Sequence, residues 1–311
     1  MRSSAAIADR SPFVQEDIFA RTAYLIVVLT SRCNLRCRGC LQQADSFGID
    51  MDDLLLEKVL QRVDDGRTLH IQITGGEPTL VPEKIKRLAS VTRDFRVRPR
   101  LSLQTNGTLL SSELLASIID NQIEVGLSLD GPPSLQQSLR GGCDATLRGM
   151  QWLEQENIPF RITTVVSAAN IEQLHRMALL VAGFACCQGI GLDLLVQRGR
   201  GTGLKLPTAK ALEAGVEKLA ATIRLINRKR QQPIHLREYD LLTRKTISTA
   251  FCYGASGKSL AITPEGKLYP CGQTLNDPRF ACGTVENPAQ SIADKLGRPR
   301  GMARDAGLRN L

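Results

Sequence analysis

Short apolar runs alternate with helical stretches over the first two thirds of this chain, and no other feature constrains its fold as strongly. The first run, Tyr24–Leu29 (YLIVVL), has no polar position, as expected of a strand buried on both faces. Further strands are predicted at His70–Ile73, Leu101–Gln104, Ile123–Leu129, Arg161–Val166 and Gly191–Val196. Helices are predicted between them at Asp52–Val63, Glu83–Thr92, Ser111–Asp120, Ala145–Glu156 and Ile171–Val181. This alternation predicts a parallel sheet with crossover helices.

The number of βα units indicates how far the sheet closes. A closed α/β barrel has eight units, and the sequence supplies six. We therefore expect an α/β fold, a partial (β/α)6 TIM-type barrel with a small C-terminal cysteine-containing extension. The glycine-rich stretch Gly199–Gly203 is interpreted as the boundary after the barrel, and a long helix is predicted near Thr208–Arg230. The expected divisions are an N-terminal extension (1–22), the barrel (23–202), a helix with a basic connector (203–250) and the cysteine-containing module (251–311).

The 311 residues include nine cysteines and carry a formal net charge of +9. An odd number of cysteines without an export signal favours metal or redox chemistry over disulfides, so we expect a cytoplasmic protein. No apolar stretch reaches the roughly 18 residues of a membrane span. Residues 203–311 hold 18 Lys and Arg against 9 Asp and Glu, whereas residues 1–202 hold 22 of each. The densest basic run contains Arg224, Arg228, Lys229 and Arg230.

Three cysteines follow the first predicted strand in one short loop, at spacings of four and three: Cys33, Cys37 and Cys40. Three such thiolates can each bind one iron of a 4Fe–4S cube and leave the fourth iron open. A structural zinc site is the alternative, but it normally has four closed ligands. No further Cys or His follows before His70. The spacing therefore predicts a cluster with an open site.

Polar or glycine-rich loops follow the next three predicted strands. They read Thr74-Gly75-Gly76-Glu77-Pro78, Gln104-Thr105-Asn106-Gly107 and Ser128-Leu129-Asp130-Gly131. Because the carboxyl ends of parallel strands share one face, we expect these loops to meet the cysteines there. The glycines permit close backbone approach, and the Glu77 carboxylate can accept a hydrogen bond from an amino group.

With CxxxCxxC at Cys33, Cys37 and Cys40 and GGEP at 75–78, the sequence resembles the radical S-adenosylmethionine (radical SAM) superfamily over residues 23–200. The resemblance implies a 4Fe–4S cluster whose open iron binds the amino and carboxylate groups of S-adenosylmethionine. It also implies reductive cleavage of this cofactor to a 5′-deoxyadenosyl radical, which abstracts hydrogen from a substrate.

The resemblance also implies a set of cofactor-binding residues. The set comprises Gly75, Gly76, Glu77, Pro78, Thr105, Asn106, Ser128, Asp130 and Arg140. Within it, the Gly75–Glu77 segment would hold the amino group, Ser128 and Asp130 the ribose or methionine portion, and Arg140 the carboxylate. One departure is Gly39, which stands before the third cysteine where the superfamily usually has a bulky or aromatic residue near the adenine. No catalytic residue beyond the cofactors is assigned.

Three later cysteines, Cys252, Cys271 and Cys282, are candidate ligands of one auxiliary iron–sulfur cluster. A hairpin is predicted around Pro264-Glu265-Gly266, and it would let Cys271 face Cys252. Cys282 could close a third position, or could be a small buried hydrophobe. The spacing from Cys252 through Gly266 to Cys271 resembles the start of the SPASM module of peptide-modifying radical SAM enzymes. Since no cysteine follows Cys282, the resemblance implies a truncated, twitch-like module without a second auxiliary cluster.

Two departures bear on the substrate. Gly272 follows Cys271 where sulfatase maturases carry Asp, and about 22 residues before the first strand are too few for a leader-binding domain. The first hypothesis is a radical SAM enzyme that modifies a peptide or protein side chain. The alternative is one that acts on a small molecule, such as a cofactor precursor, lipid or sugar.

A third hypothesis is a metal-binding regulator whose basic third binds nucleic acid. It is the weakest, because a regulator has no need of GGEP beside an open cluster and because the few aromatic residues form no stacking platform. The basic third instead predicts an acidic electron donor, such as flavodoxin or ferredoxin, as a partner.

Overall fold

The computed structural model describes residues 17–239, 253–254 and 256–289. Its strands are β1 (Tyr24–Val28), β2 (His70–Thr74), β3 (Arg100–Thr105), β4 (Glu124–Ser128), β5 (Phe160–Val166), β6 (Cys187–Leu194), β7 (His235–Leu236), β8 (Ser259–Ile262) and β9 (Leu268–Tyr269). Its α-helices are α1 (Asp53–Val63), α2 (Pro82–Arg93), α3 (Ser112–Asp120), α4 (Pro133–Leu139), α5 (Cys143–Gln155), α6 (Leu174–Val181) and α7 (Ala209–Asn227).

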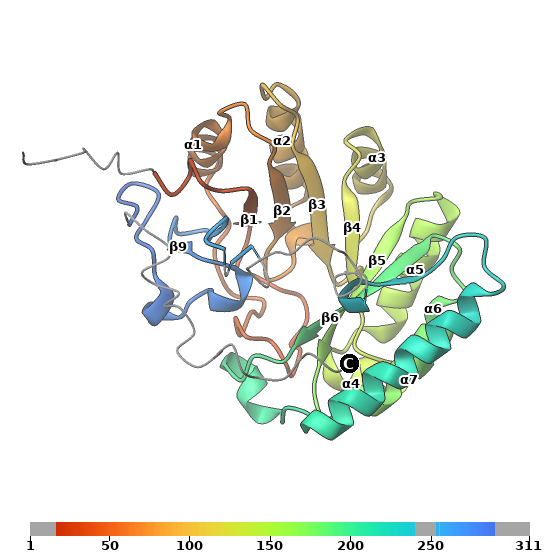
Figure 1. Ribbon diagram of the computed structural model, residues 1–311. Helices are drawn as coiled ribbons and strands as arrows, with labels where there is room; N and C mark the ends of the chain where they lie inside the picture. The colour runs from red at the N-terminus through yellow and green to blue at the C-terminus, as the bar shows by residue number, and fades with distance from the viewer. Residues whose placement is uncertain (1–16, 240–252, 255, 290–311) are drawn as a thin grey trace, which may run out of the picture.

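The nine strands of the described residues form one open sheet in the order β7-β6-β5-β4-β3-β2-β1-β8-β9. The pairs from β1 to β7 are parallel, as is the pair of β1 with β8, whereas β8 and β9 are antiparallel. The order confirms the predicted α/β fold with six consecutive βα units. Figure 1 shows the helices α1, α2, α3, α5 and α6 outside the curved sheet and α7 lying along α6.

Alternation along each strand separates two environments. Residues such as Leu25, Ile71 and Leu103 face the helices and join a core cluster that includes Leu56 of α1 and Leu88 of α2. Their strand neighbours face the inner side of the sheet, where Ile26, Val28, Ala261, Tyr269 and Leu275 form a separate small cluster. The sheet is therefore apolar on its helix side and partly polar on its inner side, as the period-two pattern of strands requires.

The predicted hairpin near the C-terminus is confirmed, and it continues the barrel sheet. Strand β8 pairs in parallel with β1, from Tyr24 with Ser259 to Val27 with Ile262. Strand β9 pairs with β8 through a turn in which Gly266 has a φ of 77°, a conformation that favours glycine. The hairpin thereby lies directly beside the strand that leads into the cysteine loop (Figure 1).

Some boundaries differ from the sequence prediction. Strand β6 begins at Cys187 rather than Gly191, because Gly189 and Ile190 extend the pairing with β5. Helix α4 was not predicted, since its seven residues are too few to show a clear helical period. No helix among the described residues is long and apolar enough to cross a membrane.

Candidate functional site

The candidate site is built around the loop that carries Cys33, Cys37 and Cys40, directly after β1. Cys33 is buried, the other two are partly exposed, and none of the three forms a disulfide. Within the loop, the Leu35 amide donates to the Cys33 Sγ at 3.4 Å and the Cys40 amide donates to the Cys37 carbonyl at 3.3 Å. The loop is thus a tight local structure with its thiols unbonded to one another.

The loop after β2 packs directly on the chain that enters the cysteine loop. The Gly76 amide donates to the Thr30 carbonyl at 2.7 Å, and the Glu77 amide donates to the Arg32 carbonyl at 2.8 Å. A Cβ on Gly75 would lie 2.8 Å from the Thr30 carbonyl oxygen, and one on Gly76 would lie 2.2 Å from the Arg32 carbonyl oxygen. The two glycines are therefore needed for the contact between these loops.

The Glu77 carboxylate lies inside the protein, 1% exposed. Its Oε1 accepts from the Thr79 amide and hydroxyl and from the Thr105 hydroxyl at 2.6 Å, and its Oε2 accepts from the Asn106 amide at 2.7 Å. Burial raises the pKa of Glu77, while these hydrogen bonds lower it. The sequence argument assigned this carboxylate to an amino group of a ligand. In the structure it joins the loops after β2 and β3, and its assignment to the amino group of a ligand stays a prediction.

The loop after β3 reaches the cysteine loop through two amide side chains. The Asn106 Nδ2 donates to the Asn34 Oδ1 at 2.9 Å, and the Asn34 Nδ2 donates to the Thr108 Oγ1 at 2.8 Å. The Asn106 Oδ1 accepts from the Thr108 amide and hydroxyl. Asn34 was not singled out from the sequence, because nothing in the sequence shows that it faces Asn106.

The loop after β4, with helix α4, places a buried ion pair beside the cysteines. Arg140 donates to the two oxygens of Asp130 at 2.7 and 3.1 Å, and the Val165 amide also donates to Asp130. Burial lowers the pKa of Arg140, but the charge of Asp130, followed by those of Cys37 and Cys40, leaves it raised. The Arg38 amide donates to the Leu139 carbonyl at the end of α4, which ties this element to the cysteine loop.

The loop after β6 makes a fourth connection, which the sequence analysis missed. The Arg200 Nε donates to the Cys37 carbonyl at 2.9 Å and its Nη2 to the Ala44 carbonyl at 2.7 Å. Its amide donates to the Cys40 carbonyl at 3.0 Å. The stretch Gly199–Gly203, predicted as the boundary after the barrel, also carries this contact. Its position after a strand end, with glycines around an arginine, was the signal that it belongs to the site.

Burial acts on two of the three thiols, those of Cys33 and Cys37, and favours their protonated forms. Burial raises the pKa of Cys33 to about 12, and it also raises the pKa of Cys37, where the Arg140 charge acts in the opposite direction. Among the described residues, no three His, Cys, Asp or Glu side chains could hold one metal ion. A 4Fe–4S cluster takes one thiolate for each iron, and metal binding deprotonates its ligands. Three close thiols next to a buried arginine fit such an anionic cluster.

Gly39 faces an apolar cluster in place of the bulky residue usual at this position. A Cβ on Gly39 would lie 3.6 Å from the Leu195 and Leu204 side chains and 3.8 Å from Val165. Leu195 and Leu204 form this cluster together with Leu139. The apolar surface next to the third cysteine thus comes from the ends of β5 and β6, from α4 and from Leu204 after the Gly199–Gly203 turn.

The inner face of the sheet next to this rim is polar. The Gln104 Nε2 donates to the Ser128 Oγ at 3.1 Å, and the Thr163 hydroxyl donates to the Gln104 Oε1 at 3.1 Å. Gln104 spans β4 at Gly126, where a Cβ would lie 2.5 Å from the Gln104 Oε1. Ser128 is thus engaged with Gln104, and both face the inner side of the sheet.

The later cysteines lie in two different environments. Cys271 begins the 3₁₀ turn Gly272–Thr274, which is close to the inner-side residue Ile26. Cys282 is 0% exposed in the helix-side core, and its Sγ donates to the Phe280 carbonyl. This placement favours the alternative of a small buried hydrophobe for Cys282. Cys252 lies outside the described residues.

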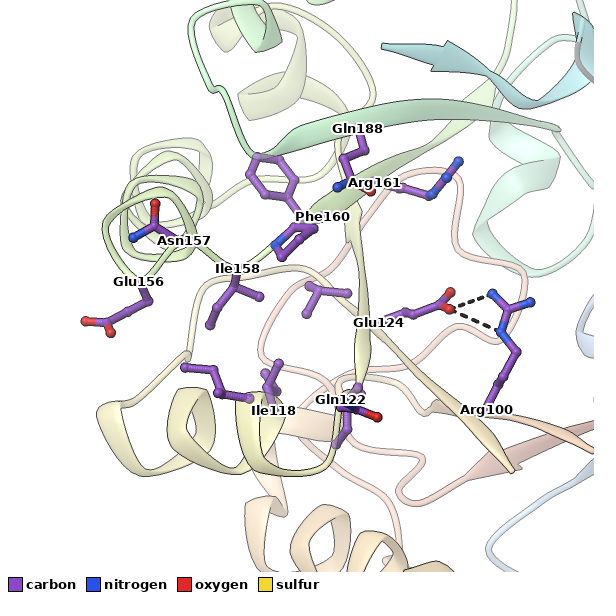
Figure 2. Close-up of a pocket in the computed structure, with 14 residues that line it drawn as sticks. Arg100, Ile118, Gln122, Glu124, Glu156, Asn157, Ile158, Phe160, Arg161 and Gln188 are labelled. Atoms are coloured by element: carbon purple, nitrogen blue, oxygen red, sulfur yellow. Dashed lines mark hydrogen bonds and ion pairs between the residues drawn. The ribbon is translucent and has the colours of Figure 1, made fainter. Parts of the chain in front are cut away.

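A pocket of about 690 Å³ lies at the opposite, amino-terminal ends of the strands. Figure 2 shows its apolar part at Ile118, Ile158 and Phe160, and the ion pair between Arg100 and Glu124 at its side. None of the residues predicted for the site lines this pocket. The barrel therefore has a cysteine-bearing rim and a separate pocket at the other edge.

The sequence model of the Radical SAM superfamily matches residues 27–181. The chain belongs to the radical SAM superfamily. Enzymes of this superfamily use a 4Fe–4S cluster and S-adenosylmethionine. The matched range contains the cysteine loop and the loops after β2, β3 and β4, whereas Arg200 lies beyond it.

Three relatives differ in how much they share with this radical SAM chain. The uncharacterized protein MJ0907 of Methanocaldococcus jannaschii is 27% identical over 80% of this chain and 84% of its own length. The antilisterial bacteriocin subtilosin biosynthesis protein AlbA of Bacillus subtilis is 27% identical over 83% of this chain and 56% of its own. The Fe-coproporphyrin III synthase of Methanosarcina barkeri is 30% identical over 47% of this chain and 37% of its own. The chain thus spans about half or less of the two relatives with a named role.

The fold is shared with the solved structure of native anSMEcpe with bound AdoMet and the Cp18Cys peptide. The TM-score is 0.70 at 22% identity, over 88% of this chain and 79% of that one. Because the likeness covers 88% of this chain, the shared fold extends past the matched domain.

Proposed function

We propose that the chain cleaves S-adenosylmethionine reductively and abstracts hydrogen from a peptide or protein side chain. The observation that carries the proposal is the convergence of four strand-end loops on one cysteine loop. The loops after β2, β3, β4 and β6 each bond to it, so three thiols, a buried arginine and a polar inner surface share one face. When bound, the cofactors supply a one-electron reductant and a radical that abstracts hydrogen.

Residues of this chain have distinct tasks in the proposed reaction. Cys33, Cys37 and Cys40 would hold the cluster, and the backbone of Gly75–Glu77 would orient the amino group of the cofactor. Arg140 would attract the cofactor carboxylate, because it is buried beside the thiols and has only one carboxylate partner, Asp130, in the described structure. The apolar cluster next to Gly39 would exclude water from the adenosine.

A peptide substrate is supported by two similar proteins. AlbA takes part in bacteriocin biosynthesis by its name, and anSMEcpe was solved with a peptide bound. The inner face adds a chemical reason, since Gln104, Ser128 and Thr163 present amide and hydroxyl groups that can bind a peptide backbone. The relative named Fe-coproporphyrin III synthase favours the second candidate, a small-molecule substrate.

The test is transfer of deuterium into 5′-deoxyadenosine. The reconstituted full chain is incubated anaerobically with S-adenosylmethionine, dithionite and a tryptic peptide pool from cells grown in deuterated medium. Deuterium in 5′-deoxyadenosine supports a peptide substrate, and deuterium only from a deuterated tetrapyrrole precursor of iron coproporphyrin supports the small-molecule candidate. Absence of 5′-deoxyadenosine with every probe would contradict the proposed chemistry.

An acidic electron donor remains part of the proposal, but the basic surface of this chain that would bind it is smaller than the sequence suggested. Arg224, Arg228 and Lys229 are exposed on α7 and after it. Arg230 instead donates to the carbonyls of Ala182, Phe184, Ala185 and Cys187 around the end of α6. Reversing the three exposed charges should slow turnover with flavodoxin and not with dithionite. Equal slowing with both reductants would exclude donor docking at this surface.

A further inference from the structure

The two residues Arg198 and Arg200 contact two different cysteine-bearing segments. Arg200 binds the loop of Cys33–Cys40 through its amide and guanidinium, which donate to the carbonyls of Cys40, Cys37 and Ala44. These are backbone acceptors, so Arg200 fixes the path of the loop without using a thiol.

Arg198 binds the segment that carries Cys271. Its Nη2 donates to the Gln273 carbonyl at 2.9 Å and to the Leu275 carbonyl at 2.7 Å, and its Nη1 lies 3.0 Å from the Asp277 Oδ2. Asp277 is 4% exposed, and its only other ion-pair partner in the described structure is Arg279. Cys271 begins the same turn, since the Thr274 amide donates to its carbonyl and the Thr274 hydroxyl lies 3.8 Å from its Sγ.

Gly199 lies between the two arginines, and its backbone packs tightly against the cysteine loop. It has a φ of 57°, and a Cβ there would lie 2.5 Å from the Leu41 carbonyl oxygen and 2.7 Å from that of Cys40. Two residues span at most about 7 Å of extended chain. A shift of the cysteine loop would therefore move Gly199, and with it the backbone that carries Arg198.

We propose that Arg198-Gly199-Arg200 is a positioning element that holds the Cys271 turn in a fixed relation to the Cys33–Cys40 loop. The two cysteine-bearing segments are more than two hundred residues apart in sequence, and they follow strands on neighbouring parts of the sheet. The element joins them by backbone-directed hydrogen bonds, so the two sites move as one unit. This inference rests on the proposed function only for the identity of the group that the first loop holds.

Hydrogen exchange on the full, metal-free chain tests the coupling without any turnover. We expect Arg200→Gln to speed exchange in residues 33–46 and, by about threefold or more, in 271–278, because residues in one network couple by energies of that order. Arg198→Gln should have the reverse pattern, strongest in 271–278 and also present in 33–46. Gly203→Ala is the matched control, because a Cβ there meets no atom within 4 Å.

The proposal is overturned if each substitution speeds hydrogen exchange only in the segment that the replaced arginine touches. In that case the other segment would exchange at the same rate as in the Gly203→Ala control. Thermal unfolding of each variant identifies global destabilisation, which would raise exchange in α2 and α5 as well. If Arg198→Gln is too unstable, Arg198→Lys retains the charge opposite Asp277 but loses the fork that reaches two carbonyls, and it gives the same comparison.

A second readout follows iron in the reconstituted protein. In a Cys271→Ala background, in which residue 271 holds no iron, Arg198→Gln should speed the release of cluster iron to bathophenanthroline by about threefold or more, although Arg198 makes no hydrogen bond to the Cys33–Cys40 loop. Unchanged release would contradict coupling. Failure to form 5′-deoxyadenosine would contradict the proposed function and leave the exchange result intact, so the two failures are distinguishable.

Discussion

The chain has two cysteine-bearing regions, and they differ in how their thiols are arranged. In the loop after β1, three cysteines lie within eight residues, and four other loops form hydrogen bonds with the residues around them. In the hairpin region, Cys271 lies at the inner side of the sheet and Cys282 in the helix-side core. A short loop can turn several thiols toward one group, whereas Cys271 and Cys282 are separated by the turns Gly272–Thr274 and Pro278–Phe280. The comparison predicts that the iron content of the protein depends far more on the cysteines of the first region than on Cys282.

The largest effect is expected from the first region. Replacing Cys33, Cys37 or Cys40 by Ala should abolish both the bound cluster and the formation of 5′-deoxyadenosine, because each thiol would hold a different iron. Iron analysis and chromatography of the reaction measure the loss. Cys186→Ala, a cysteine outside both regions, should leave both unchanged. Retention of the cluster in any of the three variants would contradict the ligand set.

The effect of one added methyl group on the free energy of unfolding compares the packing of the first region with that of the second. Gly76→Ala should lower the free energy of unfolding by about 1–3 kcal/mol or more, since a Cβ would lie 2.2 Å from the Arg32 carbonyl oxygen. Gly272→Ala, next to Cys271, should change it by less than about 0.5 kcal/mol, because the nearest atom lies 3.7 Å away. Urea unfolding of the metal-free variants measures both. Equal effects would show that the two regions are packed alike.

Glu77 joins two loops of the first region, and its removal should loosen them. Glu77→Ala leaves the buried hydroxyl of Thr105 and amide of Asn106 without their acceptor. The expected loss of unfolding free energy is about 1–3 kcal/mol. Hydrogen exchange should increase in residues 105–108. Stability equal to the original chain would mean that water replaces the carboxylate.

Replacing the two described cysteines of the second region one at a time separates their roles. Cys282→Ala should cost about 1 kcal/mol of stability through the small cavity left in the core, and it should not change the iron content. Cys271→Ala should leave stability nearly unchanged and lower the iron content, if an auxiliary cluster is bound there. Urea unfolding and iron analysis separate the outcomes. Loss of iron in the Cys282→Ala variant would show that Cys282 is a cluster ligand.

The smallest effect concerns pH. Hydrogen bonds from Arg279, together with those from Arg198, hold the pKa of Asp277 below its ordinary value. A depressed pKa in the folded state stabilises the protein above the unfolded value, which is about 4. Asp277→Asn should therefore be less stable than the original chain at pH 7, and the gap should narrow below about pH 4. A gap that is constant from pH 7 to pH 3 would contradict this origin.

Much of the fold could be predicted from the sequence because strong patterns are local. The strands β1 to β5 were placed within one residue at most boundaries, since each is a short apolar or alternating run bounded by turn residues. The start of β6 could not be predicted from the sequence, because pairing with β5 decides it. Helix α4 could not be predicted either, because packing at the rim decides it. The convergence of Gly75–Pro78 and Asn106 with the cysteines was predictable, because the ends of parallel strands share a face.

The sequence by itself determined the parallel barrel, the spacing of Cys33, Cys37 and Cys40 and the family to which they belong, because these depend on order and spacing along the chain. Only the tertiary structure decided that Glu77 binds loops within the protein, that Cys282 faces the core and that Arg198 and Arg200 join two distant segments. Each of these depends on which side chain meets which backbone group across the fold. Such contacts are set by packing between elements, and no local pattern records them.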